Sequence, residues 1–408
     1  MIYRALTTFA GPVAGAAARI AGPDWRERMV LDAGPAHRPG GVWLHGASVG
    51  ELNSGRRIVE ALVEALGRDL PVVVTANTVT GRAVAAGWGV PARLAPLDLP
   101  GAVDRFLDRH RPAVLVTLEN EIWPNRAAAA RLRGIAQVVA GARMSARSAA
   151  RWSRARGLIG PVLGGLDALS AQDGASESRL IALGLSPGAL LPRLQLKLLD
   201  PAATPVPPAS ARRDRTWLAA STHAGEEELV LDAFLQARAR VPDLQLILAP
   251  RHPRRGDEVA AMIRARGLDA ARRSAGAVGR DGAVVLVDVL GEMARWYDAA
   301  GLCLTGGSLV DHGGHTPWEP AGHGCAILHG PHVGNAAEGY AALGAAGASL
   351  GVGAGDLGAA VARLAADPAA ARAMGRRARA VLRDRAGDPG ALVDRILALA
   401  GRARQRRA

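Results

Sequence analysis

The sequence predicts an α/β protein made of two domains. Three observations support this: the chain has 408 residues, short apolar runs alternate with helical patterns, and a proline-rich stretch separates two halves of this kind. Such a length suits two or three domains of about 150 residues each. Alternating apolar runs and helices are typical of βα units around a parallel sheet. Because ligands of open α/β sheets bind beyond the carboxyl ends of the strands, we expect both domains to face a cleft.

The first domain is expected to span residues 1–199. Its apolar runs are short and bounded by loop residues, which predicts buried strands, and the segments between them have helical periodicity. The strands are expected at residues 42–45, 72–75, 113–118 and 135–140, and the helices include residues 51–66 and 102–109.

A linker is expected at residues 200–215, because residues 200–210 contain four prolines in eleven positions. The alternation then resumes, which predicts a second α/β domain at residues 216–408. Its strands are expected at residues 216–220, 244–249, 284–287, 302–305 and 326–329, and its helices at residues 226–238, 257–266 and 292–299. From about residue 356 the chain is predicted to be mainly helical.

The composition indicates a globular protein with acidic partners. Apolar residues make up 49% of the chain, which excludes a wholly disordered protein. The net charge of +13 favours nucleic acid, anionic lipid or a phosphorylated substrate, but only 3% of residues are aromatic, which argues against base stacking on single strands. Cys303 and Cys325 are too few for a disulfide scaffold and fit a reducing compartment. Lys197 is the single lysine among 50 basic residues.

Carboxylates follow two expected strands of the first domain. Glu51 opens a helix after a strand and a loop of small residues, where the helix dipole should keep it ionised and available as a general base. The alternative is that it only stabilises the helix start. Glu119 and Glu121 follow the strand at residues 113–118 and are candidates for catalysis or, alternatively, for helix capping.

Candidate phosphate-binding groups follow the strands of the second domain. Ser221 and Thr222 are able to donate to a phosphate or to cap the next helix. Arg251 lies between two prolines in a constrained loop that suits an anion, unless it is an ordinary surface loop. Two Gly-Gly pairs within residues 305–319 suggest a backbone that approaches a ligand closely, and Glu319 is suited to bind ribose hydroxyls.

Neither a metal nor a cofactor is expected. Five of the ten histidines lie between residues 312 and 332, but His312 and His315 are not on a regular helix and no cysteine pair accompanies them. The glycine pairs match neither a dinucleotide-binding fingerprint nor a P-loop.

Six segments, taken in order, resemble the 3-deoxy-D-manno-octulosonic acid (Kdo) transferase family of Gram-negative lipid A assembly. They are His-x-x-Ser-Val-Gly-Glu at 45–51, Glu-x-Glu-Ile-Trp-Pro-Asn at 119–125, Ser-Thr-His-x-Gly-Glu-Glu at 221–227, Pro-Arg-His-Pro at 250–253, Gly-Gly-Ser-Leu-Val at 306–310 and Gly-Pro-His-x-x-Asn at 330–335. The resemblance implies a GT-B fold, with two Rossmann-like domains facing a cleft. It also implies inverting, metal-independent transfer of Kdo from CMP-Kdo to a lipid A precursor, lipid IVA, in lipopolysaccharide biosynthesis.

The resemblance also implies roles for individual residues. Glu51 matches the family's general base, and Glu119 and Lys197 match residues that help to stabilise the transition state. The residues implied to bind CMP are Pro250, Arg251, Leu290, Gly291, Glu292, Thr316, Pro317, Trp318 and Glu319. The chain departs from the family pattern where Thr316 replaces an asparagine and Trp318 a smaller aliphatic residue, so the nucleotide contacts are expected to differ in detail.

Because the implied acceptor is an anionic glycolipid, the protein is expected to act at a membrane surface, namely the cytoplasmic face of the bacterial inner membrane. Nucleic acid is not expected as a partner. Residues 1–22 come nearest to a long apolar stretch, although Gly11, Pro12, Gly15 and Arg19 interrupt it. They are expected to associate with the membrane interface, or else to form an ordinary docked helix. Two alternatives remain open: another GT-B enzyme that uses a UDP-sugar, and a non-enzymatic basic protein that binds a membrane surface. Acidic residues at strand ends argue against the second.

Overall fold

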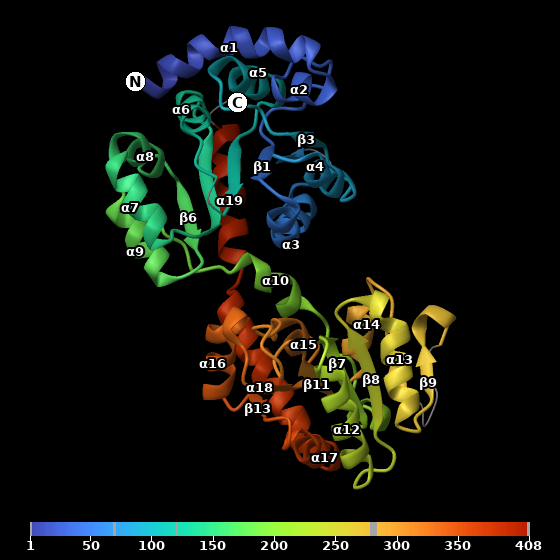
Figure 1. The fold of residues 1–408 in the computed structure, drawn as a ribbon. Coiled ribbons are helices and arrows are strands. Elements are labelled where there is room, and N and C mark those ends of the chain that lie inside the picture. Colours follow the sequence, from blue (N-terminus) through green and yellow to red (C-terminus); the bar gives the residue numbers. More distant parts are fainter. Residues whose placement is uncertain (1, 68–70, 120, 278–283, 406–408) are drawn as a thin grey trace. The chain divides into compact units, whose positions relative to one another are not determined.

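The computed structural model describes residues 2–67, 71–119, 121–277 and 284–405, and the chain divides into two compact units. The first unit comprises Met1–Leu199 together with Ala386–Ala408, and the second comprises Asp200–Arg385. Each unit contains one parallel sheet (Figure 1). The structure thus differs from the sequence-based division at the C-terminus, because residues 386–408 were expected in the second domain and lie in the first unit.

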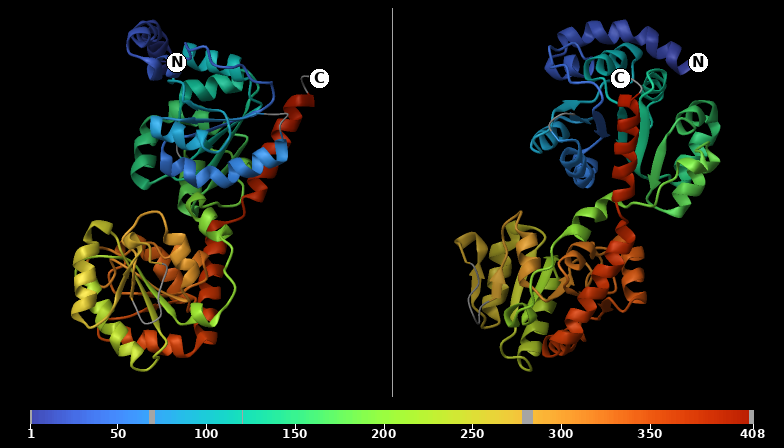
Figure 2. Two further views of the ribbon diagram at one scale, coloured as in Figure 1. Left: turned by 90° about the vertical axis from the view of Figure 1, so that its right-hand side faces the viewer. Right: turned by 180° about the vertical axis from the view of Figure 1, so that it is seen from behind.

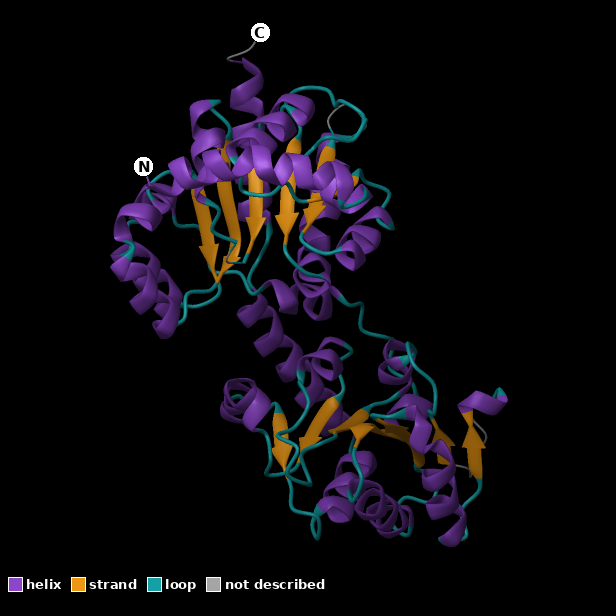
Figure 3. Cartoon of the chain, turned by 45° about the horizontal axis from the view of Figure 1, so that its top comes forward, coloured by secondary structure: helices purple, strands orange, loops and turns teal. Residues whose placement is uncertain are grey.

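The sheet of the first unit has the strand order β3-β2-β1-β4-β5-β6 of Rossmann-type sheets. Its strands are β1 (Val42–Gly46), β2 (Val72–Ala76), β3 (Ala92–Leu94), β4 (Val114–Leu118), β5 (Ala136–Ala142) and β6 (Ala168–Ala171). Figure 3 shows them side by side and pointing the same way. Since the strand order reverses between β1 and β4, the loops that follow these two strands diverge and leave room for a ligand at the carboxyl edge.

Helices cover both faces of this sheet, because successive strand side chains point to opposite faces. The helices of the first unit are α1 (Ile2–Ile20), α2 (Pro23–Arg28), α3 (Val49–Leu66), α4 (Val79–Ala86), α5 (Pro100–His110), α6 (Pro124–Leu132), α7 (Ala146–Arg154), α8 (Arg156–Leu163), α9 (Gly174–Ala182) and α19 (Gly390–Gln405). Helix α10 (Leu196–Ala203) begins in the first unit and ends in the second. The C-terminal α19 lies against the first unit (Figure 2), where it packs on α3, β4 and β5. Its Leu392 and Ile396 side chains are buried. This burial of apolar side chains accounts for the return of the C-terminus to the first unit.

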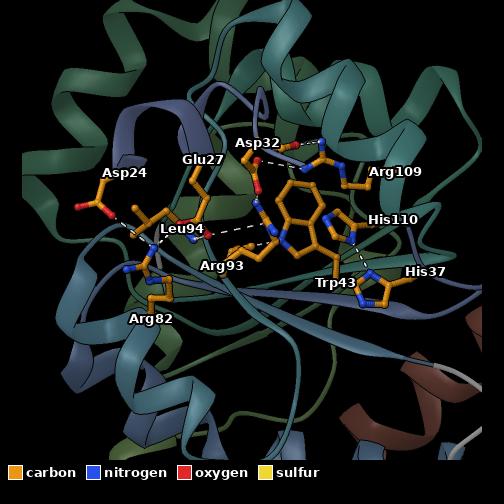
Figure 4. A network of polar contacts seen from close by, with 11 residues as sticks. Asp24, Glu27, Asp32, His37, Trp43, Arg82, Arg93, Leu94, Arg109 and His110 are labelled. Carbon is orange, nitrogen blue, oxygen red and sulfur yellow. Dashed lines mark hydrogen bonds and ion pairs between the residues drawn. The ribbon is translucent and has the colours of Figure 1, made fainter. Parts of the chain in front are cut away.

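Ion pairs hold the segment after α1 against the edge of the sheet (Figure 4). Asp32 pairs with Arg93 of β3 and, at 3.2 Å, with Arg109 of α5. Glu27 of α2 pairs with Arg82 of α4. These partly buried pairs come from four separate elements, so they fix the position of α2 on the unit.

Helix α1 packs against α5, and its Tyr3 hydroxyl donates to Asp98 at 3.0 Å. The face away from α5 exposes Leu6, Phe9 and Val13, and Phe9 is 81% exposed. Their spacing of three and four residues places them along one side of the helix. None of the helices within the described residues has the length and apolar content needed to cross a bilayer.

The sheet of the second unit has the order β13-β12-β11-β7-β8-β10-β9 and is parallel. Its strands are β7 (Thr216–Thr222), β8 (Gln245–Pro250), β9 (Ala270–Arg272), β10 (Val284–Leu286), β11 (Leu302–Thr305), β12 (Ala326–His329) and β13 (Ser349–Gly351). Its helices are α11 (Ala211–Asp214), α12 (Glu226–Arg238), α13 (Gly256–Ala265), α14 (Met293–Ala299), α15 (Trp318–Gly322), α16 (Ala337–Ala345), α17 (Leu357–Ala366) and α18 (Pro368–Ala386). The expected linker at residues 200–215 is partly helical, because α10 ends within it and α11 lies within it. The order reverses between β7 and β11, which marks the carboxyl ends of these strands as a second candidate ligand site.

Candidate active site

Glu51 lies in the first turn of α3, just after β1, where the strand order of the first unit reverses. Ser48 caps this helix, since its Oγ accepts the Glu51 N–H at 3.3 Å. In return, Oε2 of Glu51 accepts the Ala47 N–H at 2.7 Å. This arrangement is close to a capping box, so Glu51 stabilises the start of the helix and also places a carboxylate at the carboxyl edge of the sheet.

The surroundings of Glu51 shift its pKa in the direction opposite to the effect expected of the helix dipole. Partial burial raises the pKa of Glu51, and the Ala47 N–H opposes this only in part. The carboxylates of Glu119 and Glu121 raise this pKa further, whereas Lys197 lowers it. A carboxyl group with a raised pKa is a better proton acceptor when it is ionised, which suits a general base.

Glu119 follows β4 and has a strained backbone. Its φ of 55° lies in the left-handed region, although it is not a glycine. The Glu119 N–H donates to the Ala140 carbonyl at 2.9 Å and thereby continues the contact between β4 and β5. Its buried Oε1 accepts no hydrogen bond from the residues that the structure describes. A strained residue with an unsatisfied carboxylate oxygen is typical of a functional site.

Lys197 of α10 lies on the same side of the first unit, with Nζ 3.8 Å from Oε1 of Glu119. Its side chain is 68% exposed, so solvent weakens this ion pair and leaves the ammonium group accessible to an anion. The structure therefore brings together Glu51, Glu119 and Lys197, the three residues expected to be catalytic.

Glu121 is held as an anion beside these residues. Its Oε2 accepts from Trp123 Nε1 at 2.6 Å and from Asn77 Nδ2 at 3.0 Å, and it lies 3.6 Å from His45 Nε2. Burial alone raises the pKa of Glu121, but the His45 ring and these two donors outweigh it and place the pKa at about 2.

His45 is completely buried, and this burial together with the nearby Arg126 charge lowers its pKa to about 4. The ring is therefore neutral at pH 7, and its Nδ1 contacts the Thr75 hydroxyl at 2.9 Å. Sequence reasoning assigned no role to Asn77 or Thr75. The available signal was their position at the end of an expected strand.

The Trp-Pro-Asn segment braces the start of α6. Asp98 accepts the N–H groups of Asn125 at 3.0 Å and Arg126 at 2.7 Å. The Asn125 side chain donates to the Asp98 carbonyl and to the Thr7 hydroxyl of α1. This segment therefore orients Trp123, which contacts Glu121, and it also ties α1 to the candidate site.

The site of the second unit is organised around a buried carboxylate, Glu226. It accepts the N–H groups of Gly307 at 2.6 Å, Ser308 at 3.0 Å and Leu309 at 2.9 Å, together with that of His223 at 2.9 Å. The glycine pair in this loop predicts a backbone that approaches a ligand closely. That expectation is wrong for these amides, because Glu226 already occupies them.

The hydroxyl of Thr222 is also engaged within the unit. It donates to Oε1 of the buried Glu227 at 3.0 Å, and the same oxygen accepts from Arg255 at 2.6 Å. Of the two roles considered for Thr222, its contacts favour support of the helix start over donation to a phosphate.

Four histidines gather at the carboxyl ends of β7, β8 and β11. His223 and His315 approach through their Nε2 atoms at 2.9 Å, His312 stacks on His223, and the His252 ring is 6.0 Å from that of His223. Burial, followed by the charge of Arg251, lowers the pKa of His315. Across the described parts of the chain, no group of three or more His, Cys, Asp or Glu side chains is arranged to hold a metal.

The residues expected to bind CMP lie at the same sheet edge. They follow β8 (Pro250 and Arg251), β10 (Leu290, Gly291 and Glu292) and β11 (Thr316, Pro317, Trp318 and Glu319). The Arg251 side chain is exposed, while its N–H donates to the Thr222 carbonyl at 2.9 Å. Glu292 makes a two-pronged ion pair with Arg273, at 2.8 and 2.9 Å, which lowers the pKa of Glu292. Sequence reasoning missed Arg273, which lies beyond the expected elements.

Comparison with known proteins identifies relatives of this chain. Residues 23–198 match the family model of 3-deoxy-D-manno-octulosonic-acid transferase (kdotransferase). A 3-deoxy-D-manno-octulosonic acid transferase of Bordetella pertussis is 37% identical over 339 residues, which are 78% of this chain and 77% of the relative. The enzyme of the same name from Haemophilus influenzae is 33% identical over 311 residues, or 74% of this chain and 73% of the relative.

Among solved structures, UDP-GlcNAc 2-epimerase from Neisseria meningitidis bound to UDP-GlcNAc is similar with a TM-score of 0.53 and 9% identity, over 88% of this chain and 98% of that one. A likeness at this identity concerns the fold alone and agrees with two Rossmann-like domains of the GT-B type. The two bacterial transferases, in contrast, match most of their own length at 33% identity or more. The chain therefore belongs to the 3-deoxy-D-manno-octulosonic acid transferase family and is a GT-B glycosyltransferase.

Proposed function

We propose that this protein transfers Kdo from CMP-Kdo to a lipid A precursor, lipid IVA, with inversion at the anomeric carbon. The strongest support is the grouping of Glu51, Glu119 and Lys197 at the carboxyl edge of the first sheet. Family membership supports Kdo transfer in lipopolysaccharide biosynthesis. Glu51 is the general base, because its carboxylate has a raised pKa and lies where an acceptor can reach it.

In the proposed step, the acceptor hydroxyl oxygen bonds to the anomeric carbon of Kdo. The bond from that carbon to the CMP phosphate oxygen breaks, and CMP leaves with the electron pair. Glu51 receives the hydroxyl proton. Oε1 of Glu119 stabilises the positive charge that develops on the sugar ring, and Lys197 binds the Kdo carboxylate or the departing phosphate. This step needs neither a metal nor a cofactor.

The second unit binds the nucleotide in this proposal. Arg251 is an exposed guanidinium at a sheet edge and suits the phosphate, while Glu319 suits the ribose hydroxyls. Because Arg273 already binds the Glu292 carboxylate, the main chain at Leu290, Gly291 and Glu292 is the part available to the nucleotide.

A product assay tests the activity. We expect incubation with CMP-Kdo and tetra-acylated lipid A precursor to add one or more Kdo masses to the glycolipid, as measured by mass spectrometry. CMP should also raise the melting temperature, whereas UDP should not. Stabilisation by UDP alone, without a change in glycolipid mass, would favour a UDP-sugar enzyme instead.

The pH dependence of turnover should reveal the electrostatics at Glu51. Since its pKa is raised, the acid limb of kcat/KM is expected above the value of about 4.3 for an ordinary glutamate. Lys197→Gln removes the cation that lowers this pKa, so the acid limb should move to higher pH while the plateau falls. A rate profile measured from acid to neutral pH gives both quantities, and an acid limb that moves to lower pH would contradict the assignment.

We also propose that α1 binds an anionic membrane surface, at the cytoplasmic face of the bacterial inner membrane. Its apolar side chains Leu6, Phe9 and Val13 are exposed on one side. Docking of this side in the interface would bury apolar area. The rest of α1 is tied to the first unit by Tyr3 and Thr7, so docking would hold the candidate site near the lipid acceptor.

Charged substitutions on α1 test the membrane proposal. Leu6→Glu with Phe9→Glu should lower the fraction that sediments with phosphatidylglycerol-containing vesicles by about tenfold or more, because both side chains are solvent-exposed and neither supports the fold. Leu235→Glu, at a partly exposed position in the second unit, is the control. Equal sedimentation of the double variant and the control would exclude α1 as the docking element.

A further inference from the structure

A cavity of about 510 Å³ lies in the first unit, at the amino-terminal edge of β4 and β5. Its wall includes the residues that immediately precede these two strands and β6. Glu51 and Glu119 follow the carboxyl ends of β1 and β4, so this cavity is at the opposite edge of the sheet from the candidate active site. Its volume is within the range of about 300–1,000 Å³ that is usual for small-molecule sites.

The wall of this cavity is rich in arginine. The last turn of α6 contributes Arg131 and the turn after it Arg133, and the C-terminal helix α19 contributes Arg395 and Arg402. On α19, Arg395, Leu399 and Arg402 are spaced by four and three residues, which places them on one side of the helix. The packing of α19 on the sheet thus brings two arginine pairs, more than 250 residues apart in sequence, to a single cavity.

Most of this positive charge is not neutralised. Arg133 pairs with Asp104 at 2.7 Å and Asp108 at 3.2 Å. Arg131 and Arg395, in contrast, donate to main-chain carbonyls, of Pro161 and Asp167 respectively. Arg402 has neither a hydrogen bond nor an ion pair with any residue that the structure describes. Each guanidinium has five N–H donors, so these three retain donors for a ligand.

Among the described residues that line the cavity, only Asp167 has a carboxylate, and it is already engaged. Its Oδ2 accepts the Gln137 N–H at 2.8 Å. Gly165 lies under Arg131, where a Cβ atom would be 1.5 Å from a guanidinium nitrogen, so the chain leaves space for this side chain. The cavity therefore combines a small-molecule volume with three uncompensated guanidinium groups.

We propose that this cavity is a second anion site, which binds a phosphate-bearing ligand away from the site of sugar transfer. Guanidinium groups bind phosphate oxygens through paired hydrogen bonds, and several around one cavity favour a multiply charged phosphate. The phosphate comes either from a small soluble molecule or from a lipid headgroup.

Calorimetric titration with inorganic pyrophosphate tests this site in the full-length protein, at constant ionic strength and with CMP in excess. Arg395→Gln with Arg402→Gln should weaken pyrophosphate binding by about tenfold or more. The matched control is Arg264→Gln with Arg376→Gln, which removes two exposed charges from the second unit and should leave binding within about twofold. Arg402→Glu alone removes a side chain that makes no hydrogen bond or ion pair with the described residues, so it should not disturb the fold. It should also weaken pyrophosphate binding.

The same variants are compared for sedimentation with vesicles of phosphatidylethanolamine and phosphatidylglycerol. If the cavity variants lose pyrophosphate binding and the control does not, a soluble phosphate is a sufficient ligand of the cavity. If the cavity variants lose only vesicle binding, the phosphate bound in the cavity is that of a lipid headgroup. If the cavity variants match the control in both measurements, the proposal is wrong, and this outcome does not depend on whether the protein transfers Kdo.

Discussion

Glu51→Gln should reduce kcat by about 10²–10⁴-fold while leaving the protein folded. Glutamine has the same shape, and its carbonyl oxygen can still accept the Ala47 N–H that Glu51 accepts at 2.7 Å. It cannot take a proton from an acceptor hydroxyl, however, because the amide is a very weak base. The change therefore separates the two roles of this residue, helix capping and proton transfer. Turnover measured by mass spectrometry of the glycolipid gives the loss of rate.

Two measurements make this prediction specific. Glu64→Gln removes an exposed carboxylate further along α3 and should leave turnover within about twofold of the wild type. Binding of CMP, measured by thermal shift, should be the same in Glu51→Gln and in the wild type, because the expected nucleotide residues belong to the second unit. Turnover by Glu51→Gln close to that of the control would show that another group is the base.

The interior of each sheet could be predicted from sequence, but its edges could not. The runs at 42–45 and 113–118 became the central strands β1 and β4, because strands covered on both faces are continuously apolar. Three of the four edge strands in the described sheets, β3, β9 and β13, have only three residues each and include Arg93, Arg272 and Gly351, so no apolar run marks them. The path of the C-terminus was missed for another reason: a helical pattern does not reveal which of two sheets it covers.

The residues of the candidate site could be predicted from sequence, but the contacts that surround them could not. Glu51, Glu119 and Lys197 were expected from sequence and lie on one side of the first unit. The direction of the Glu51 pKa was not predictable, because it depends on burial and on two carboxylates that another strand brings near. The glycine loop at 306–309 was taken for a ligand contact because the acidic side chain that fills it is 81 positions away from Gly307. Long-range contacts of this kind leave no local pattern in a sequence.

Of the substitutions proposed for this protein, Glu226→Ala should cause the largest loss of stability. The Glu226 carboxylate accepts four backbone N–H groups, those of His223, Gly307, Ser308 and Leu309. The side chain is fully buried, and an unsatisfied buried donor costs about 1–3 kcal/mol. Entry of water would recover part of this cost, so we expect the free energy of opening at this loop to fall by about 3–5 kcal/mol.

Amide hydrogen exchange at residues 307–309 measures this loss directly. A decrease of about 3 kcal/mol accelerates exchange through local opening by more than about 100-fold at these amides. Glu338→Ala is the matched control, because Glu338 is a highly exposed glutamate with a long 3.8 Å contact to Arg385, and its removal should cost well below about 1 kcal/mol. A Glu226→Ala protein whose 307–309 amides exchange as slowly as those of the control would mean that the loop keeps its shape without the carboxylate. Rapid exchange would instead assign the loop to the framework of the site and leave the phosphate to side chains such as Arg251.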